Sequence, residues 1–214
     1  MTRPGGRSPV AVLTEALGGA ACAVHGLHRT PAPLPKRAWQ RDATVTDRAV
    51  LAHCRGATLD VGCGPGRMAE GLALRGVPVM GIDVVPAAVA ETRARGVPAL
   101  VRDVFDPLPA EGRWRTVLLA DGNIGIGGDP ARLLLRVAGL LADGGRVVLD
   151  VQPPGTGLRT HRLQLSSAAG RSTPFLWAQV GVDAVGALAV GCGLRVVVLD
   201  RLGERWFAVL ERRR

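Results

Sequence analysis

Three glycines at alternate positions follow an apolar run that ends at Asp60. Gly62, Gly64 and Gly66 stand in the segment DVGCGPG. Glycine lets a backbone turn sharply and approach a ligand without a side-chain clash, so this spacing indicates a loop that holds a nucleotide-like molecule. A phosphate-binding P-loop needs a lysine followed by serine or threonine, which this segment lacks. The dinucleotide fingerprint needs a third glycine where this chain has Arg67.

The same segment resembles motif I of the class I S-adenosylmethionine-dependent methyltransferases, in which an acidic residue precedes three alternating glycines. S-adenosylmethionine carries no phosphate, which agrees with a loop that has no lysine. An acidic Asp60 at the end of a strand suits a ligand with an ammonium and a sulfonium group. The segment LLADGGRVVLDV, residues 140–151, resembles a later motif of the same family.

The resemblance also implies a role for the residues at the ends of the next apolar runs. Asp83 would accept hydrogen bonds from the ribose hydroxyls. Asp103 would contact the adenine amino group, and the backbone of Val104 would face the ring. Asp121 and Asn123 would contact the methionine part and begin the acceptor pocket. The full set of residues implied to bind the cofactor is Asp60, Gly62, Cys63, Gly64, Gly66, Asp83, Val84, Asp103, Val104, Asp121 and Asn123.

The catalytic residues are harder to predict than the cofactor site. A sulfonium methyl group is already activated, so a general base is needed only if the acceptor is protonated at the working pH. The chain has no tyrosine, which leaves histidine as the candidate type, with His161 and His28 as candidates. Trp39 and Trp177 have two open interpretations, apolar walls of the acceptor pocket or packing in the core, and core packing is the favoured one. Arg67 has two open interpretations, a contact to the cofactor carboxylate or an exposed position on the first turn of a helix.

No metal site is expected. The four cysteines form no CxxC pair. Asp121 and Asp150 lie where catechol-type members of the family hold Mg²⁺, but those enzymes need an asparagine beside the second aspartate, and this chain has Val151 there.

The elements that must position these residues alternate along the chain. Apolar runs predict strands near 59–61, 77–83, 97–105, 114–121, 145–151, 194–200 and 205–211. Helices are predicted near 46–53, 67–76, 86–96, 130–142 and 181–193. This order predicts an α/β, three-layer fold: a seven-stranded, mostly parallel sheet with helices on both faces. The short turn at residues 201–204 makes the last two strands antiparallel, which places one reversed strand near the edge.

The N-terminal part is expected to differ from the rest. Residues 9–17 predict a short amphipathic helix, and the proline-rich residues 29–36 predict a linker. We therefore divide the chain into an N-terminal helical cap and linker, residues 1–43, and a methyltransferase domain, residues 44–214. Residues 152–178 are expected to build the acceptor pocket together with the cap. The first residues resemble a signal peptide, but Glu15 interrupts the apolar stretch, so a cytoplasmic location is expected.

The composition of the chain indicates which kinds of partner it is expected to bind. The formal net charge is +9, from 27 lysine and arginine residues against 18 acidic ones, but these residues are scattered. With three phenylalanines and four tryptophans, the chain offers few platforms for base stacking, so nucleic acid is not the expected partner. No run has the 18 apolar residues of a membrane helix.

The expected function is methyl transfer to a small molecule by direct displacement. The alternatives are an NAD-dependent oxidoreductase, a non-catalytic S-adenosylmethionine-binding protein and an RNA methyltransferase.

Overall fold

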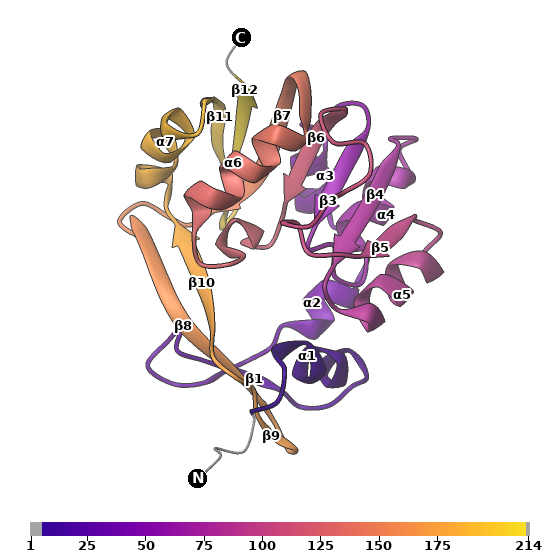
Figure 1. Cartoon of the computed structure of the whole chain (residues 1–214), viewed down its shortest axis with the longest axis vertical. Coiled ribbons are helices and arrows are strands. Elements are labelled where there is room, and N and C mark those ends of the chain that lie inside the picture. The colour runs from indigo at the N-terminus through magenta and orange to yellow at the C-terminus, as the bar shows by residue number, and fades with distance from the viewer. Residues whose placement is uncertain (1–5, 213–214) are drawn as a thin grey trace.

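The computed structural model describes residues 6–212, which form a large sheet between helices and a smaller sheet beside it (Figure 1). The strands of the large sheet are β3 (Thr58–Val61), β4 (Val79–Asp83), β5 (Ala99–Val101), β6 (Trp114–Leu119), β7 (Leu141–Val151), β11 (Leu194–Leu202) and β12 (Arg205–Arg212). The smaller sheet consists of β1 (Ala23–His25), β2 (Ala32–Pro33), β8 (Leu158–Ser167), β9 (Gly170–Arg171) and β10 (Phe175–Val180). The helices are α1 (Pro9–Leu17), α2 (Lys36–Gln40), α3 (Val45–Leu51), α4 (Arg67–Ala73), α5 (Pro86–Ala94), α6 (Pro130–Leu140) and α7 (Val182–Gly191), with a 3-10 turn η1 (Asn123–Gly125).

The large sheet has the strand order β11-β12-β7-β6-β3-β4-β5. The pairs among β7, β6, β3, β4 and β5 are parallel, whereas β12 runs antiparallel to both β7 and β11. The tight β11–β12 connection leaves no room for a crossover helix, so the two strands must run in opposite directions. The predicted seven-stranded sheet, with its reversed strand next to one edge, is confirmed.

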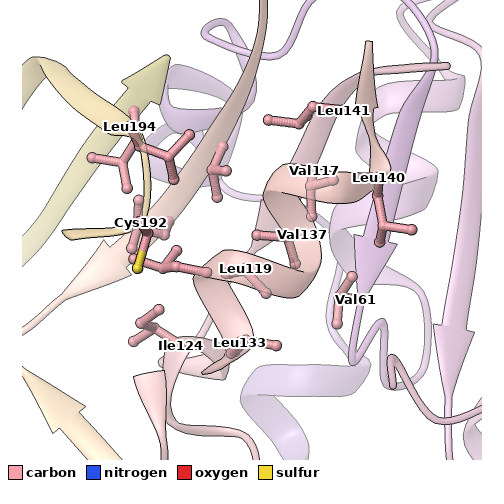
Figure 2. Close-up of a cluster of buried hydrophobic side chains, with 14 of the residues drawn as sticks. Val61, Val117, Leu119, Ile124, Leu133, Val137, Leu140, Leu141, Cys192 and Leu194 are labelled. Carbon is pink, nitrogen blue, oxygen red and sulfur yellow. The ribbon is translucent and has the colours of Figure 1, made fainter. Parts of the chain in front are cut away.

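Two buried clusters fill the space between this sheet and its helices. Successive residues of a strand point to opposite faces. On β7, Val147 and Leu149 therefore join one cluster, and Val148 joins the other. Helices α6 and α7 cover the first face, and α3 and α4 cover the second. Figure 2 shows the first cluster, in which Leu133 and Val137 of α6 lie over the strands. Burial of both faces explains why the strands are apolar nearly throughout.

Local capping interactions define where several helices begin. Asp129 accepts a hydrogen bond from the backbone of Arg132 at 3.0 Å at the start of α6. Thr44 and Asp47 form a reciprocal capping box at the start of α3. The third predicted strand, by contrast, is shorter than expected. It ends at Val101 because the Asp103 carboxylate accepts a hydrogen bond from the Phe105 backbone, which forms a turn.

The smaller sheet was not predicted. Its strands follow the order β10-β8-β1-β2, so the N-terminal segment and residues 158–180 build one antiparallel unit. The N-terminal segment, expected to be a helix and a linker, therefore also contributes two strands. Pro33 is compatible with β2 because this strand lies at the edge of the sheet. Helix α1, as predicted, spans Pro9–Leu17 and packs against β8 and α5.

Candidate functional site

A cavity of about 610 Å³ lies between the carboxyl ends of the parallel strands and the smaller sheet. Its two sides differ in chemistry. The side on the large sheet carries glycines, four aspartates and Asn123. The opposite side is apolar and is formed by Pro9, Val10, Leu13, Leu17, Val24, Leu27, Leu34, Pro35, Trp39, Leu163, Leu165, Phe175, Leu176 and Trp177. Binding sites of open α/β sheets lie at this edge, outside the carboxyl ends of the strands.

The glycine loop between β3 and α4 has a backbone that other residues would not adopt readily. Gly62, Gly64 and Gly66 all have positive φ, at 69°, 54° and 90°. A Cβ on Gly62 would lie 2.6 Å from the side-chain nitrogen of Asn123. A Cβ on Gly66 would lie 2.9 Å from the Cα of Thr92. The backbone path thus favours glycine at all three positions, and close neighbours on the following elements add to the requirement at Gly62 and Gly66.

Asn123 fixes this loop from the adjacent strand end. Its side-chain amide donates hydrogen bonds to the carbonyl oxygens of Val61 and Gly62, both at 2.9 Å. These two bonds join the end of β3 to the turn η1, which follows β6. The glycine loop and the start of the predicted acceptor side are therefore connected directly.

Asp60, the last but one residue of β3, has a carboxylate that is buried beneath the cavity. Neither of its oxygens has a hydrogen-bond partner among the described residues, and the residue is 1% exposed. Burial, together with the nearby negative charge of Asp121, raises the pKa of Asp60 to about 7. A buried carboxylate without a partner is costly, and a cationic group in the cavity would relieve this cost.

Asp83 ends β4 and contacts the glycine loop directly. Its carboxylate accepts hydrogen bonds from the backbone of Gly64 at 2.9 Å and of Val85 at 2.8 Å. Burial raises the pKa of Asp83, although these backbone donors oppose the shift. Next to it, the side chain of Asp103 is exposed, while Val104 is buried. The three strand ends thus bring their aspartates to the same side of one cavity.

A buried network of charges lies behind the glycine loop. Arg67 is 3% exposed and forms ion pairs with both Asp47 and Asp121. Arg205 binds Asp150 through two hydrogen bonds of 2.7 Å and reaches Asp47 at 2.6 Å. The interpretation of Arg67 as an exposed residue is therefore wrong, because α3 and Asp121 enclose its guanidinium. The sequence alone did not reveal the part that Asp47 and Arg205 play.

The same network sets the conformation of Asp121. This residue has a left-handed backbone, with φ 53°, which is rare outside glycine. Its backbone nitrogen donates to the Asp150 carboxylate at 2.6 Å, and its side chain pairs with Arg67. Asp150 stands where related enzymes hold a metal ligand, and here both of its carboxylate oxygens accept hydrogen bonds from Arg205.

Not all of the candidate residues line the cavity. Ten of the eleven residues predicted to bind the cofactor do, and Gly66 instead packs on Thr92. His161 lies opposite Trp177 in the β8–β10 pairing and bonds to Gln179 at 3.0 Å, outside the lining of the cavity. His28 is exposed and does not line it either. Trp39 and Trp177 both line the cavity, in agreement with the first of their two interpretations.

Most individual residues of the apolar side were not predicted from the sequence, although a signal for four of them exists. Leu163 and Leu165 stand two apart on β8, and Phe175 and Trp177 stand two apart on β10. Such alternation is typical of strands with one apolar face. These four side chains line the cavity. Their spacing would have predicted two half-buried strands within residues 158–180.

The strand order, the reversed β12 and the site at the carboxyl ends of β3, β4 and β6 define a Rossmann-like fold of the class I methyltransferase type. Residues 58–145 match the family model of a methyltransferase domain. No curated protein matches the sequence.

Solved structures share the fold. One is an S-adenosylmethionine-dependent methyltransferase from Bacteroides fragilis in complex with S-adenosyl-L-homocysteine. It is 21% identical, with a TM-score of 0.80, over 98% of this chain and 97% of that chain. Another is the 1,6-didemethyltoxoflavin-N1-methyltransferase of Burkholderia thailandensis, which is 19% identical, with a TM-score of 0.60, over 80% and 79% of the two chains. A third is an amino pentose methyltransferase from Micromonospora echinaspora, 21% identical, with a TM-score of 0.57, over 78% and 87%.

The methyltransferase-domain match over residues 58–145 and the fold shared with solved methyltransferases support the predicted family, the class I S-adenosylmethionine-dependent methyltransferases.

Proposed function

We propose that this methyltransferase transfers a methyl group to a small, largely apolar acceptor by direct in-line displacement. The observation that carries this proposal is the division of the cavity. Backbone and carboxylates from the large sheet form one side, and apolar side chains from α1, β8 and β10 form the other. Such a division suits a polar, cationic cofactor on the first side and an apolar acceptor on the second.

The residues of the polar side fit S-adenosylmethionine. The carboxylate of Asp60, which has no hydrogen-bond partner among residues 6–212, would bind the ammonium group, and Asp83 would bind the ribose hydroxyls. A Cβ on Gly64 would meet no atom within 4 Å, so the glycine leaves open space toward the ligand. Asp103 and Val104 would contact the adenine. When bound, the cofactor supplies a methyl group that its sulfonium has already activated.

The residues of the apolar side would select the acceptor. Burial of apolar surface contributes roughly 25 cal/mol per Å², so these walls favour a ligand that has little charge. Trp39 and Trp177 add flat surfaces for a ring. Among proteins of similar fold, one acts on 1,6-didemethyltoxoflavin and another on an amino pentose, and small-molecule acceptors are therefore in keeping with the fold.

The contribution of the chain to the reaction would be positioning and exclusion of water. Holding two reactants in line can supply several kcal/mol, up to roughly 7–11 in favourable cases. Asp121 and Asn123, which are fixed by Arg67 and by the β3 carbonyls, would set the boundary between the two halves of the cavity. His161 and His28 stay predictions as general bases, and neither lines the cavity as it stands.

The alternatives can be separated. The methyltransferase domain match gives no support to an NAD-dependent oxidoreductase. A non-catalytic binding protein would bind S-adenosylhomocysteine and show no transfer to any acceptor. An RNA methyltransferase would show steep salt dependence of binding to RNA.

The test is calorimetric titration of the full chain with S-adenosylhomocysteine, followed by an acceptor screen with labelled S-adenosylmethionine. We expect binding, and Asp83→Ala should weaken it by about tenfold or more, because each charge-assisted bond contributes roughly 1.5–3 kcal/mol. Asp42→Ala, which removes an exposed carboxylate that does not line the cavity, is the matched control. Transfer should favour uncharged acceptors. Absence of binding at about 1 mM ligand, a concentration at which even weak sites fill, would refute the proposal.

Two further expectations belong to this proposal. A cytoplasmic location is supported by four cysteines that are all free, since reducing compartments keep thiols unpaired. Within the described residues, no helix has the length and apolarity to cross a membrane. The domain boundary at residue 43 stays a prediction, and the pairing of β1 with β8 ties the two parts together.

A further inference from the structure

A second cavity, of about 520 Å³, lies at the opposite edge of the large sheet, where the parallel strands begin. Its lining is almost entirely charged and consists of Arg55, Arg115, Gly144, Arg146, Arg195, Glu211 and Arg212. We call it the arginine cavity. Nothing in the proposed methyl transfer uses it, because the cofactor and acceptor cavity lies at the carboxyl ends of the same strands.

Paired strands bring three of these side chains together. Glu211 of β12 lies opposite both Arg146 of β7 and Arg195 of β11. Its two carboxylate oxygens accept from Arg146 at 2.7 Å and from Arg195 at 2.9 Å. Arg146 is 7% exposed, so the base of the cavity is a buried guanidinium held in place by a carboxylate.

Two further arginines of the lining, Arg55 and Arg115, have contacts that involve the main chain. The buried hydroxyl of Thr116 accepts from the backbone nitrogen of Arg55 and donates to its carbonyl oxygen, both at 2.9 Å. Arg115 lies where the register of β6 on β7 shifts, and its guanidinium donates to the carbonyl oxygen of Asp143 at 2.9 Å. These contacts fix the backbone at Arg55 and the guanidinium of Arg115, while the rim side chains themselves are exposed and accessible to a ligand.

The positive charge of the cavity exceeds the negative charge around it. Five guanidiniums line it with one carboxylate, Glu211, and among the described residues the second acidic contact is Asp143, 3.6 Å from Arg212. Burial lowers the pKa of Arg146, and the charge of Arg55 adds to this effect. An anion bound here would offset the repulsion between like charges at close range.

We propose that the arginine cavity binds a small, multiply charged phosphate group, that of inorganic pyrophosphate or of a nucleotide. Guanidinium groups match phosphate oxygens in pairs of parallel hydrogen bonds, which makes arginine the preferred residue for such ligands. The lining holds no aromatic side chain, so it offers no surface for base stacking. Recognition therefore falls on the phosphate chain. Guanidiniums from one loop and four strands converge on one recess, which suits a compact ligand.

The test is titration of the full chain with pyrophosphate at about 0.15 M salt, where exposed charges are screened beyond roughly 8 Å. We expect a Kd of about 0.1 mM or lower. Arg195→Gln and Arg55→Gln should each weaken binding by about tenfold, because each removes a charge-assisted contact. Arg171→Gln removes the same charge from β9, at the far end of the molecule, and should leave binding unchanged (Figure 1).

Parallel titrations separate the sources of the ligand. An affinity for adenosine diphosphate equal to that for pyrophosphate indicates recognition of the phosphate chain alone. A higher affinity for adenosine diphosphate than for pyrophosphate indicates that the ligand is a nucleotide. Either result supports the proposal, provided that Arg195→Gln weakens the binding of that ligand. No binding of pyrophosphate, or an equal loss in Arg171→Gln, overturns it. A short oligoribonucleotide that binds through Arg195 while pyrophosphate does not also overturns it. Arg195→Gln should bind S-adenosylhomocysteine like the unchanged chain, which keeps this test independent of the proposed function.

Discussion

At the level of single residues, Asp60 combines a buried position with a carboxylate that has no partner among the described residues. A protein interior tolerates such a group only at a cost, which suggests that the position serves binding and not stability. The neighbouring carboxylates of Asp47 and Asp150, in contrast, are each paired with arginine. The difference marks Asp60 as the side chain prepared for a cation.

Asp60→Asn keeps the shape of the side chain and removes its charge. We expect the affinity for S-adenosylhomocysteine to fall by about tenfold or more, since a contact to a charged group contributes roughly 1.5–3 kcal/mol. At pH 8, the free energy of unfolding of the ligand-free variant should equal or exceed that of the unchanged chain. Titration calorimetry and urea unfolding measure the two effects. A variant that loses stability and affinity together would show Asp60 to be a structural residue.

The raised pKa of Asp60 also predicts a pH dependence of stability. The folded chain holds this proton up to about pH 7, whereas an unfolded aspartate releases it near its ordinary pKa of about 3.9. The stabilisation from proton binding is therefore complete below about pH 4 and is lost as the pH rises to about 7. Over this window, the free energy of unfolding of Asp60→Asn should rise relative to that of the unchanged chain, by at most about 4 kcal/mol. Parallel stability curves between pH 4 and pH 8 would contradict this, and urea unfolding at several pH values provides the measurement.

At the level of elements, the glycine loop performs two tasks at different positions. Gly66 lies against α5, where a Cβ would contact Thr92 at 2.8 to 3.1 Å. A Cβ on Gly64, which lines the cavity, would meet open space. One glycine therefore serves packing between α4 and α5, and the other serves the ligand.

Two alanine variants distinguish these tasks. Gly66→Ala should lower the free energy of unfolding by more than about 2 kcal/mol, because left-handed backbone strain of roughly 1–2 kcal/mol adds to the clash with Thr92. Gly64→Ala carries the strain alone, so its stability should fall less, but its methyl group should weaken S-adenosylhomocysteine binding more than that of Gly66→Ala. Urea unfolding and calorimetric titration measure both. Equal losses of stability in the two variants would show that contact with α5 does not decide the requirement for glycine.

The elements of the large sheet could be predicted because their signals are local. Apolar runs such as GRVVLDV mark buried strands, and Asp129-Pro130 marks a helix start that the structure bears out. Ten of the predicted cofactor residues likewise reach one cavity, since the carboxyl ends of parallel strands share an edge. The smaller sheet could not be predicted in this way. It pairs Val24 with Leu165, and nothing local in either segment specifies a partner so distant in the sequence.

At the level of the whole molecule, eight arginines that are scattered along the sequence gather in space into two groups. One group, with Arg41, Arg67 and Arg205, neutralises the buried carboxylates behind the glycine loop. The other lines the arginine cavity with few acidic partners. The net charge of +9 therefore says little by itself, because the chain uses positive charge for internal pairing at one end of the sheet and leaves it in excess at the other.

The first group connects parts of the chain that are far apart, since Arg205 of β12 binds Asp150 of β7 and Asp47 of α3. Arg205→Gln should lower the free energy of unfolding by about 3–5 kcal/mol, because it leaves the buried Asp150 carboxylate without its arginine and removes one of the three arginines that pair with Asp47. Arg201→Gln, in the same hairpin, breaks an ion pair with the exposed Glu204 and should cost less than about 1 kcal/mol. Denaturant unfolding compares the two variants at neutral pH. Because Asp150 also accepts the backbone hydrogen bond of Asp121, Arg205→Gln should weaken S-adenosylhomocysteine binding as well. Similar losses of stability in the two variants would mean that the buried charges are not coupled across the sheet.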